Sequence, residues 1–275
     1  MLFTLELILV GAVTGLLSGL LGVGGGFLFV PLLTLIGVPM RSAAGLSLLY
    51  VACIAAAGAV SHYRQGTADV KVAAAAIPGG VIVVPLGSYC SALLPNGLLQ
   101  MTFGLLVLAA AGGLFWQSAE RNPFPGVAVV GSGTRRPPWV IMRRARVQGV
   151  EYVFPVSLLR GFLVGAITGF FSGLVGVGGG PILVALLILV VGVPVHIAMG
   201  TSLLIIVLPA VGGAVAHYGL GHIDLASAVP AMLAGALGAV LGARRTLLLP
   251  AEGLKSLMIW LLVLVAIYMV GRGAL

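Results

Sequence analysis

Hydroxyl side chains lie beside two glycine-rich motifs, and together these residues could bind a small anion. The first motif reads GLLSGLLGVGGG from Gly15 to Gly26, and the second reads GFFSGLVGVGGG from Gly169 to Gly180. Hydroxyl groups can donate hydrogen bonds to sulfonate, phosphate or carboxylate oxygens, and the amides at the start of a helix attract anions. The predicted substrate-binding residues are Ser18, Gly24, Gly25, Gly26, Gly45, Ser47, Ser172, Gly178, Gly179, Gly180, Gly200, Thr201 and Ser202.

The same residues also allow a purely structural interpretation. Glycines let helices in membranes pack closely, and serine or threonine hydroxyls routinely bond back to their own helix. A single copy of the motif would favour that interpretation. Two copies, each interrupting a long apolar run, favour a substrate site, because a duplicated, glycine-broken hydrophobic segment is typical of the binding site of a transporter.

Two histidines recur at matching places, each followed by a tyrosine at the end of a predicted helix. They are His62, before Tyr63, and His217, before Tyr218. A tyrosine at a helix end is a usual anchor at the membrane surface, and anchoring is the favoured interpretation of both pairs. Histidine also titrates near neutral pH, so proton coupling through His62 and His217 stays open. No Asp or Glu lies in the middle of a predicted span, so the usual buried carboxylate for coupling is missing.

The composition places these motifs in a membrane protein. The 275 residues are 60% hydrophobic and 7% charged, whereas soluble domains carry about 25% charged residues. The apolar runs are continuous and long enough to cross a bilayer as helices. We therefore expect an all-α, multi-pass protein of the cell membrane, in contact with the lipid bilayer. The arginines between the halves fit a role in orientation better than nucleic-acid binding. No cofactor or metal is expected, since no metal-ligand spacing occurs, and a homodimer is left open.

The two motifs belong to a repeat that covers most of the chain. The offset is 154 residues (169 − 15) at the glycine motif and 155 residues (213 − 58) at the sequence before each histidine. A fixed frame of this length indicates that each half is one structural unit. The predicted organisation is a first membrane repeat at 1–116, an arginine-rich cytoplasmic linker at 117–154 and a second membrane repeat at 155–275.

Apolar runs and glycines give the expected helices. The first apolar block, 4–36, is split by the glycines at 22–26, because glycine disfavours a helix by about 1 kcal/mol relative to alanine. In the linker, prolines exclude a continuous helix, and we expect 126–130 to pair with 139–150 as a short hairpin. The other helices are expected at 43–61, 71–94, 97–116, 155–175, 181–191, 196–216, 225–247 and 252–271.

The distribution of basic residues favours inverted repeats. If the glycines turn the chain back, each half crosses the membrane an odd number of times, and the linker side holds 12 of the 14 Lys and Arg residues. If each broken block is one kinked span, the repeats are parallel and that side holds 10. The first division obeys the positive-inside rule better. It predicts that both termini lie outside the cell and that the linker lies inside.

An intramembrane serine protease is the alternative from another class. Such an enzyme needs a serine and a histidine within reach of each other, together with donors for an oxyanion. Here Gly15 lies one residue too far from Ser18 for a rhomboid-like GxSG sequence. The serine and the histidine also recur symmetrically, which one active site does not require. The sequence therefore favours a transporter over an enzyme.

The two glycine motifs, followed by Pro31, Gly-Val-Pro and a stretch ending in Ser-Leu, resemble the TauE/SafE family, also called TSUP. The resemblance covers nearly the whole chain outside the linker. It implies a plasma-membrane permease that exports small sulfur-containing anions such as sulfite or organosulfonates. An uptake permease for a related inorganic or carboxylate anion is the alternative within transport. The first half has Leu46 where the second has Thr201, so direct hydroxyl contact there depends on Ser47.

Overall fold

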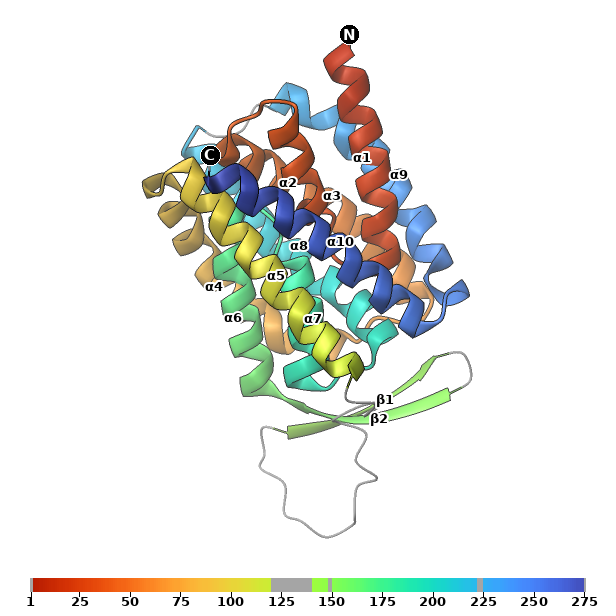
Figure 1. The fold of residues 1–275 in the computed structure, drawn as a ribbon. Helices are drawn as coiled ribbons and strands as arrows, with labels where there is room; N and C mark the ends of the chain where they lie inside the picture. The colour runs from red at the N-terminus through yellow and green to blue at the C-terminus, as the bar shows by residue number, and fades with distance from the viewer. Residues whose placement is uncertain (1, 120–139, 148–149, 222–224, 275) are drawn as a thin grey trace.

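The computed structural model describes residues 2–119, 140–147, 150–221 and 225–274, which form two sets of helices joined by a β-hairpin (Figure 1). The first set is α1 (Leu2–Leu21), α2 (Gly26–Leu35), α3 (Met40–Arg64), α4 (Val70–Leu93) and α5 (Asn96–Ala119). The hairpin consists of β1 (Val140–Val147) and β2 (Val150–Ser157). The second set is α6 (Leu158–Val175), α7 (Gly180–Leu186), the π-helical turn η1 (Leu187–Val191), α8 (Val195–Gly219), α9 (Leu225–Arg245), the 3₁₀ turn η2 (Thr246–Leu248) and α10 (Ala251–Ala274).

Seven helices in the described part of the chain are long and apolar enough to cross a membrane. They are α3, α4, α5, α6, α8, α9 and α10. Three shorter segments are apolar as well: Leu5–Leu21 of α1, Gly26–Leu35 (α2) and Gly180–Val191 (α7 with η1). Large apolar side chains such as Leu237, Trp260 and Ile267 are about 70% exposed on the outer surface. A water-soluble protein rarely exposes so much apolar surface, so these faces contact lipid. The expected all-α polytopic membrane fold is confirmed.

Helices of each set pack against helices of the other set. The first helix of each set packs along the fourth helix of the other, α1 on α9 and α6 on α4. Glycines make these contacts close: Gly15 faces the backbone of Gly235, and a Cβ atom at Gly169 would lie 2.5 Å from the carbonyl oxygen of Gly80. Small residues permit such close approach of helices in a membrane. Neither set therefore buries its own small-residue faces.

The long helices α3 and α8 pack against each other, and each also contacts helices of these pairs. In the most apolar stretch of each of these helices, 72% of the residues are buried, compared with 39% in α5 and α10. Each begins directly after a proline, Pro39 or Pro194. The glycine breaks between α1 and α2 and between α6 and α7 lie beside this central pair.

The termini and the hairpin lie at opposite ends of the molecule (Figure 1). At the end with the termini, Arg41 donates to the carbonyl oxygen of Leu94 over 2.7 Å. At the hairpin end, Arg143 of β1 pairs with Asp69 over 2.8 Å. Figure 1 also shows α1 running down from the terminal end and α6 running up from the hairpin. Inverted repeats require opposite runs of this kind, and the inversion remains a prediction.

The hairpin differs from the expected one. Strand β1 pairs with β2 in antiparallel register, from Val140 opposite Ser157 to Val147 opposite Val150. The expected partner strand at 126–130 lies outside the described residues. The helix expected at 155–175 is present as α6, but its start was placed three residues too early, since β2 continues to Ser157 and α6 begins at Leu158. The apolar sequence of β2 reads like the start of the following helix, which explains the error.

Candidate functional site

Each glycine break is a left-handed turn. At the first break, Gly24 and Gly25 both have φ of 71°, and at the second break Gly178 and Gly179 have φ of 71° and 72°. Side chains other than that of glycine rarely accept this conformation. Helices α2 and α7 begin at the next residue in each case. The duplicated GGG sequence is therefore required to turn the chain before a new helix.

The two breaks touch each other. A Cβ atom at Gly26 would lie 2.5 Å from the carbonyl oxygen of Val177, and one at Gly180 would meet the backbone of Val23. The amide of Gly26 donates to the Gly24 carbonyl oxygen over 2.9 Å, so it is engaged within its own loop. Close packing thus accounts for the last glycine of each motif, Gly26 and Gly180. Any substrate site therefore depends on the neighbouring side chains.

Three of the five predicted hydroxyls are buried without a hydrogen-bond partner. They are Ser18, Ser47 and Ser172, and each is at most 1% exposed. Ser18 lies next to Gly25, and the Ser47 Oγ lies 2.9 Å from where a Cβ atom of Gly26 would be. An unsatisfied buried polar group costs about 1–3 kcal/mol, and native proteins retain few of them. These serines are candidates for binding a polar ligand.

The other two hydroxyls already have partners. Thr201 Oγ1 accepts from the Asp69 amide over 2.9 Å. Ser202 Oγ donates to the carbonyl oxygen of Met199, 2.7 Å away in its own helix, and also contacts the carbonyl of Gly22 at the first break. The structural interpretation therefore describes these two residues. Gly45 is buried in α3, and Gly200 faces the Thr67 carbonyl. Neither glycine lines the cavity at the second break.

A small cavity adjoins the second break. It has a volume of about 10 Å³, which is about the size that holds one water molecule. Two of the predicted residues, Ser172 and Gly178, line it. Sequence reasoning missed the other residues that line it: Thr168, Gly169, Leu183, Ile205, Ile206 and Pro209. The repeat alignment held the missing signal, because Thr168 recurs as Thr14 in the first half.

Both repeated histidines are fully buried rather than interfacial. His62 Nε2 lies 2.9 Å from the Gly19 carbonyl oxygen, and its Nδ1 lies 2.8 Å from Thr67 Oγ1. His217 Nε2 lies 3.0 Å from the Gly173 carbonyl oxygen. The anchoring interpretation was therefore wrong for the histidines, which bond α3 to α1 and α8 to α6. Tyr63 and Tyr218, 61% and 60% exposed, keep the position of an interfacial anchor.

Asp69 connects the hairpin to the second helix set. Its carboxylate caps α4 by accepting from the amides of Lys71 and Val72, and its other oxygen pairs with Arg143 of β1. Its amide donates to Thr201 at the start of α8. Through Asp69, strand β1 of the hairpin is fixed to the part of α8 that contacts the first glycine break.

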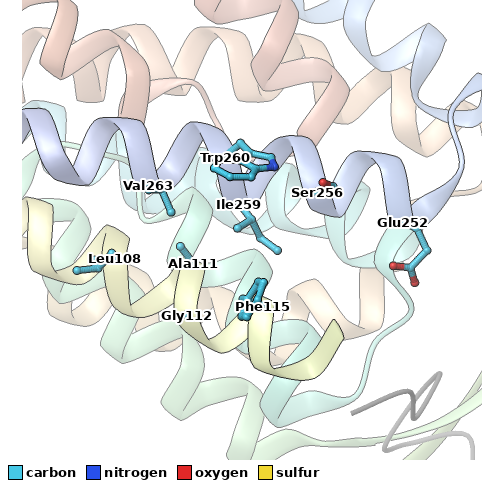
Figure 2. A pocket seen from close by; sticks show the side chains of 9 residues that line it. All are labelled: Leu108, Ala111, Gly112, Phe115, Glu252, Ser256, Ile259, Trp260 and Val263. Atoms are coloured by element: carbon cyan, nitrogen blue, oxygen red, sulfur yellow. The ribbon is translucent and has the colours of Figure 1, made fainter. Parts of the chain in front are cut away.

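A wider pocket between α5 and α10 contains none of the predicted residues (Figure 2). It has a volume of about 570 Å³, and its lining includes Phe115, Ile259 and Trp260. Phe115 is 64% exposed and Trp260 is 71% exposed, so this groove opens on the lipid-facing side. Because this pocket is an apolar groove on the outer surface of the helices, its large volume does not indicate a substrate site. The buried hydroxyls without partners are the better indication.

Comparisons with known proteins agree with this architecture. The family model described as sulfite exporter TauE/SafE matches residues 7–269. The probable membrane transporter protein YdhB of Bacillus subtilis is 28% identical over 254 residues, covering 91% of this chain and 93% of that protein. YunE of the same organism is 24% identical over 97% of both chains.

A further relative comes from an archaeon. The probable membrane transporter protein MJ0441 of Methanocaldococcus jannaschii is 26% identical over 84% of both chains. No solved structure gives a significant match. The names of these relatives describe transporters and not enzymes. The family match over nearly the whole chain, together with helices able to cross the membrane, leads to one conclusion: this chain is a multi-pass membrane transporter that belongs to the TauE/SafE sulfite exporter family.

Proposed function

We propose that this transporter exports small sulfur-containing anions such as sulfite or an organosulfonate. The family description supports the class of substrate. The observation that carries the proposal is the set of three buried serine hydroxyls without partners at the glycine breaks, Ser18, Ser47 and Ser172. Such hydroxyls can donate to the oxygens of a sulfite or sulfonate group. Bonding to substrate would compensate for the burial of each hydroxyl that the substrate contacts.

Binding by hydroxyls is weak, which suits a transporter that must release its cargo. Each hydrogen bond contributes about 0.5–1.5 kcal/mol net. A few such bonds correspond to an affinity in the millimolar range or weaker. The cavity beside Ser172 holds about one water molecule, and sulfite is larger. Transport therefore requires the helices around the breaks to separate.

The test is flux through the purified protein in liposomes. Vesicles loaded with labelled sulfite, ethanesulfonate or acetate are diluted, and efflux is compared with that from vesicles without protein. We expect efflux of both sulfur anions and little movement of acetate. Movement of acetate alone would favour the carboxylate permease, and uptake without efflux would favour an importer. If neither sulfite nor ethanesulfonate moves, the proposed function is rejected.

We further propose that the halves, 1–116 and 155–275, are inverted repeats and that the linker, 117–154, is cytoplasmic. The opposite runs of α1 and α6 support the inversion (Figure 1). The basic residues gathered at the linker side support the orientation. Single cysteines at positions 2 and 140, labelled from one face of intact cells in a background without Cys53 and Cys90, test both points. Labelling of both positions from the same face would reject this topology.

A further inference from the structure

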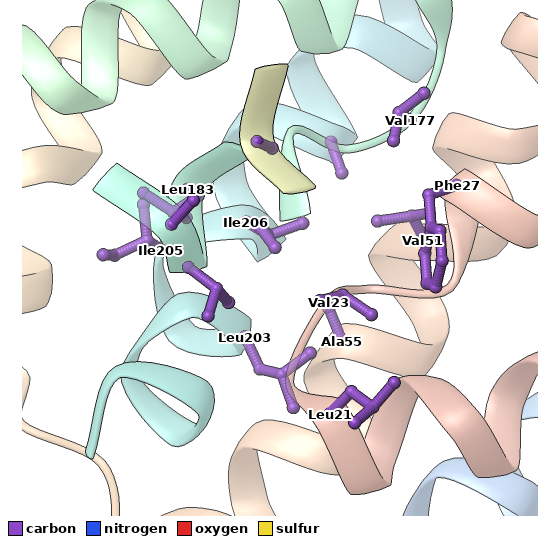
Figure 3. Close-up of a cluster of buried hydrophobic side chains, with 14 of the residues drawn as sticks. Leu21, Val23, Phe27, Val51, Ala55, Val177, Leu183, Leu203, Ile205 and Ile206 are labelled. Atoms are coloured by element: carbon purple, nitrogen blue, oxygen red, sulfur yellow. The ribbon is translucent and has the colours of Figure 1, made fainter. Parts of the chain in front are cut away.

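The two glycine breaks share the same sequence motif, but different side chains pack around them. The cavity beside the second break is lined by Leu183 of α7 and by Ile205 and Pro209 of α8. Figure 3 shows Leu183 and Ile205 close together within the buried cluster, opposite Val51 and Phe27. In the repeat frame, the equivalents of Leu183 and Ile205 are Phe29 and Tyr50. Two aliphatic side chains in the second half thus correspond to two aromatic side chains in the first.

The aromatic pair occupies the equivalent place in the first half. The rings of Phe29 and Tyr50 stack with centroids 4.0 Å apart and an interplanar angle of 10°. Tyr50 is fully buried, and its hydroxyl donates to the Gly11 carbonyl oxygen over 2.7 Å. The same hydroxyl lies 2.7 Å from Thr14 Oγ1. This stacked and hydrogen-bonded pair fills the place in the first half that corresponds to the cavity wall at Leu183 and Ile205 in the second half.

Only one hydroxyl at the cavity is available to a ligand. Thr168 Oγ1 donates within its own helix, with the carbonyl oxygens of Val164 and Gly165 at 2.8 and 3.1 Å. Ser172 Oγ is 1% exposed and has no partner. The remaining walls are apolar, as at Leu183, Ile205 and Pro209. The cavity therefore offers one donor for an anion oxygen and an apolar surface for an alkyl group.

We propose that substrate binds at only one of the two breaks, the second, with an anion oxygen on Ser172 and an alkyl group against Leu183 and Ile205. Phe29 and Tyr50 exclude it from the first break. This inference rests on the proposed function and specifies its site. The closed cavity holds about one water molecule, so binding requires the helices around the second break to separate. Because each buried CH₂ group favours binding about fourfold, a short organosulfonate then binds at this break more tightly than sulfite does.

The decisive variant transfers the aromatic pair to the second half. In Leu183→Phe/Ile205→Tyr, the new hydroxyl has acceptors at Thr168 Oγ1 and the Gly165 carbonyl oxygen, the equivalents of Thr14 and Gly11. The first half shows that this helix arrangement accommodates such a pair. We expect at least a tenfold loss of ethanesulfonate flux and of the thermal shift that ethanesulfonate causes in detergent. The matched control, Tyr50→Phe, keeps both rings and retains flux within twofold of the parent.

A serine pair decides the question if the double variant does not fold. Ser172→Ala should lower ethanesulfonate flux and its thermal shift about tenfold more than Ser18→Ala does. Equal losses in the two serine variants, or parental flux in a folded double variant, would overturn the one-sided site. These outcomes are separate from failure of the proposed function: a parent protein that binds ethanesulfonate but does not move it rejects export, while the thermal shifts still locate the site.

Discussion

The two glycine breaks turn the chain in the same way but are stabilised differently. In the second half, Ser202 bonds across to the first break and Thr201 accepts from the Asp69 amide. In the first half, the equivalent residues are Ser47, whose hydroxyl has no partner, and Leu46, which has no hydroxyl. The two breaks therefore share the same backbone turn, while the side chains around them differ. The turn is the part that geometry enforces, and the side chains are free to specialise.

The largest effect is expected where the two breaks touch. Gly180→Ala places a Cβ atom against the Val23 backbone, and Gly26→Ala places one 2.5 Å from the Val177 carbonyl oxygen. Overpacking of this kind costs about 1–3 kcal/mol and occasionally more. We expect Gly180→Ala to lower the melting temperature in detergent most, with Gly26→Ala next.

The matched control for this contact is Gly112→Ala in α5. A Cβ atom there meets nothing within 4 Å, and alanine favours a helix by up to about 1 kcal/mol over glycine. This variant should melt at or above the parental temperature. If Gly180→Ala melts like Gly112→Ala, the breaks are not held by close contact.

The link through Asp69 should give the next largest effect. Asp69→Ala removes the cap of α4, which is worth about 0.5–2 kcal/mol, and it also removes the partner of Arg143. Asp69→Asn keeps an oxygen for the cap and should lose less stability, as should Arg143→Ala. Thermal melting of the three variants separates the contribution of the α4 cap from that of the ion pair with Arg143. Equal losses in Asp69→Ala and Asp69→Asn would show that the cap contributes nothing.

The serine pair that distinguishes the halves should show a smaller effect on stability. Ser202→Ala loses hydrogen bonds that are each worth about 0.5–1.5 kcal/mol. Ser47→Ala loses none and should leave the melting temperature within error or raise it, since an unsatisfied hydroxyl is removed. Chemical or thermal unfolding in detergent compares them. A loss in Ser47→Ala as large as that in Ser202→Ala would mean that Ser47 is held by a water or a ligand in the purified protein.

The smallest effect is expected in the pH dependence of transport. Both histidines bond to carbonyl oxygens of a neighbouring helix, at Gly19 and Gly173, so we expect them to hold helices rather than to carry protons. The double variant His62→Gln/His217→Gln should keep the parental shape of the flux profile between about pH 5 and pH 8, even if total flux falls. A profile that becomes flat would instead assign proton coupling to these residues.

Much of the fold could be predicted from sequence because it follows from apolar length and from glycine. The expected helices at 43–61 and 196–216 correspond to α3 (Met40–Arg64) and α8 (Val195–Gly219), which extend beyond the expected ends by about one turn or less at each end. The helix expected at 181–191 is confirmed in its bounds, since the structure has a helix from Gly180 to Val191, but its last five residues are π-helical. An apolar run does not reveal which hydrogen-bond spacing the backbone adopts.

The candidate site was less predictable because it depends on contacts between the halves. The sequence pointed to Ser18, Ser47 and Ser172, yet it gave no means of telling them from Ser202, whose partner lies 180 residues away at Gly22. Nor could it show that Tyr50 closes one half, because a tyrosine in an apolar run is compatible with many packing positions. Pairing across long sequence separations determines these differences.

The packing of helices from one set against helices of the other also has a consequence for how the protein is made. Helix α1 leaves the ribosome first, but α9, the helix that covers its glycine face, begins roughly 200 residues later, or about 10 to 40 s of synthesis. During that interval the face of Gly11 and Gly15 that later meets α9 has only lipid or the insertion machinery beside it. A nascent chain halted before α9 should therefore remain crosslinkable at α1 to the membrane insertase and lose that crosslink once α9 enters the bilayer.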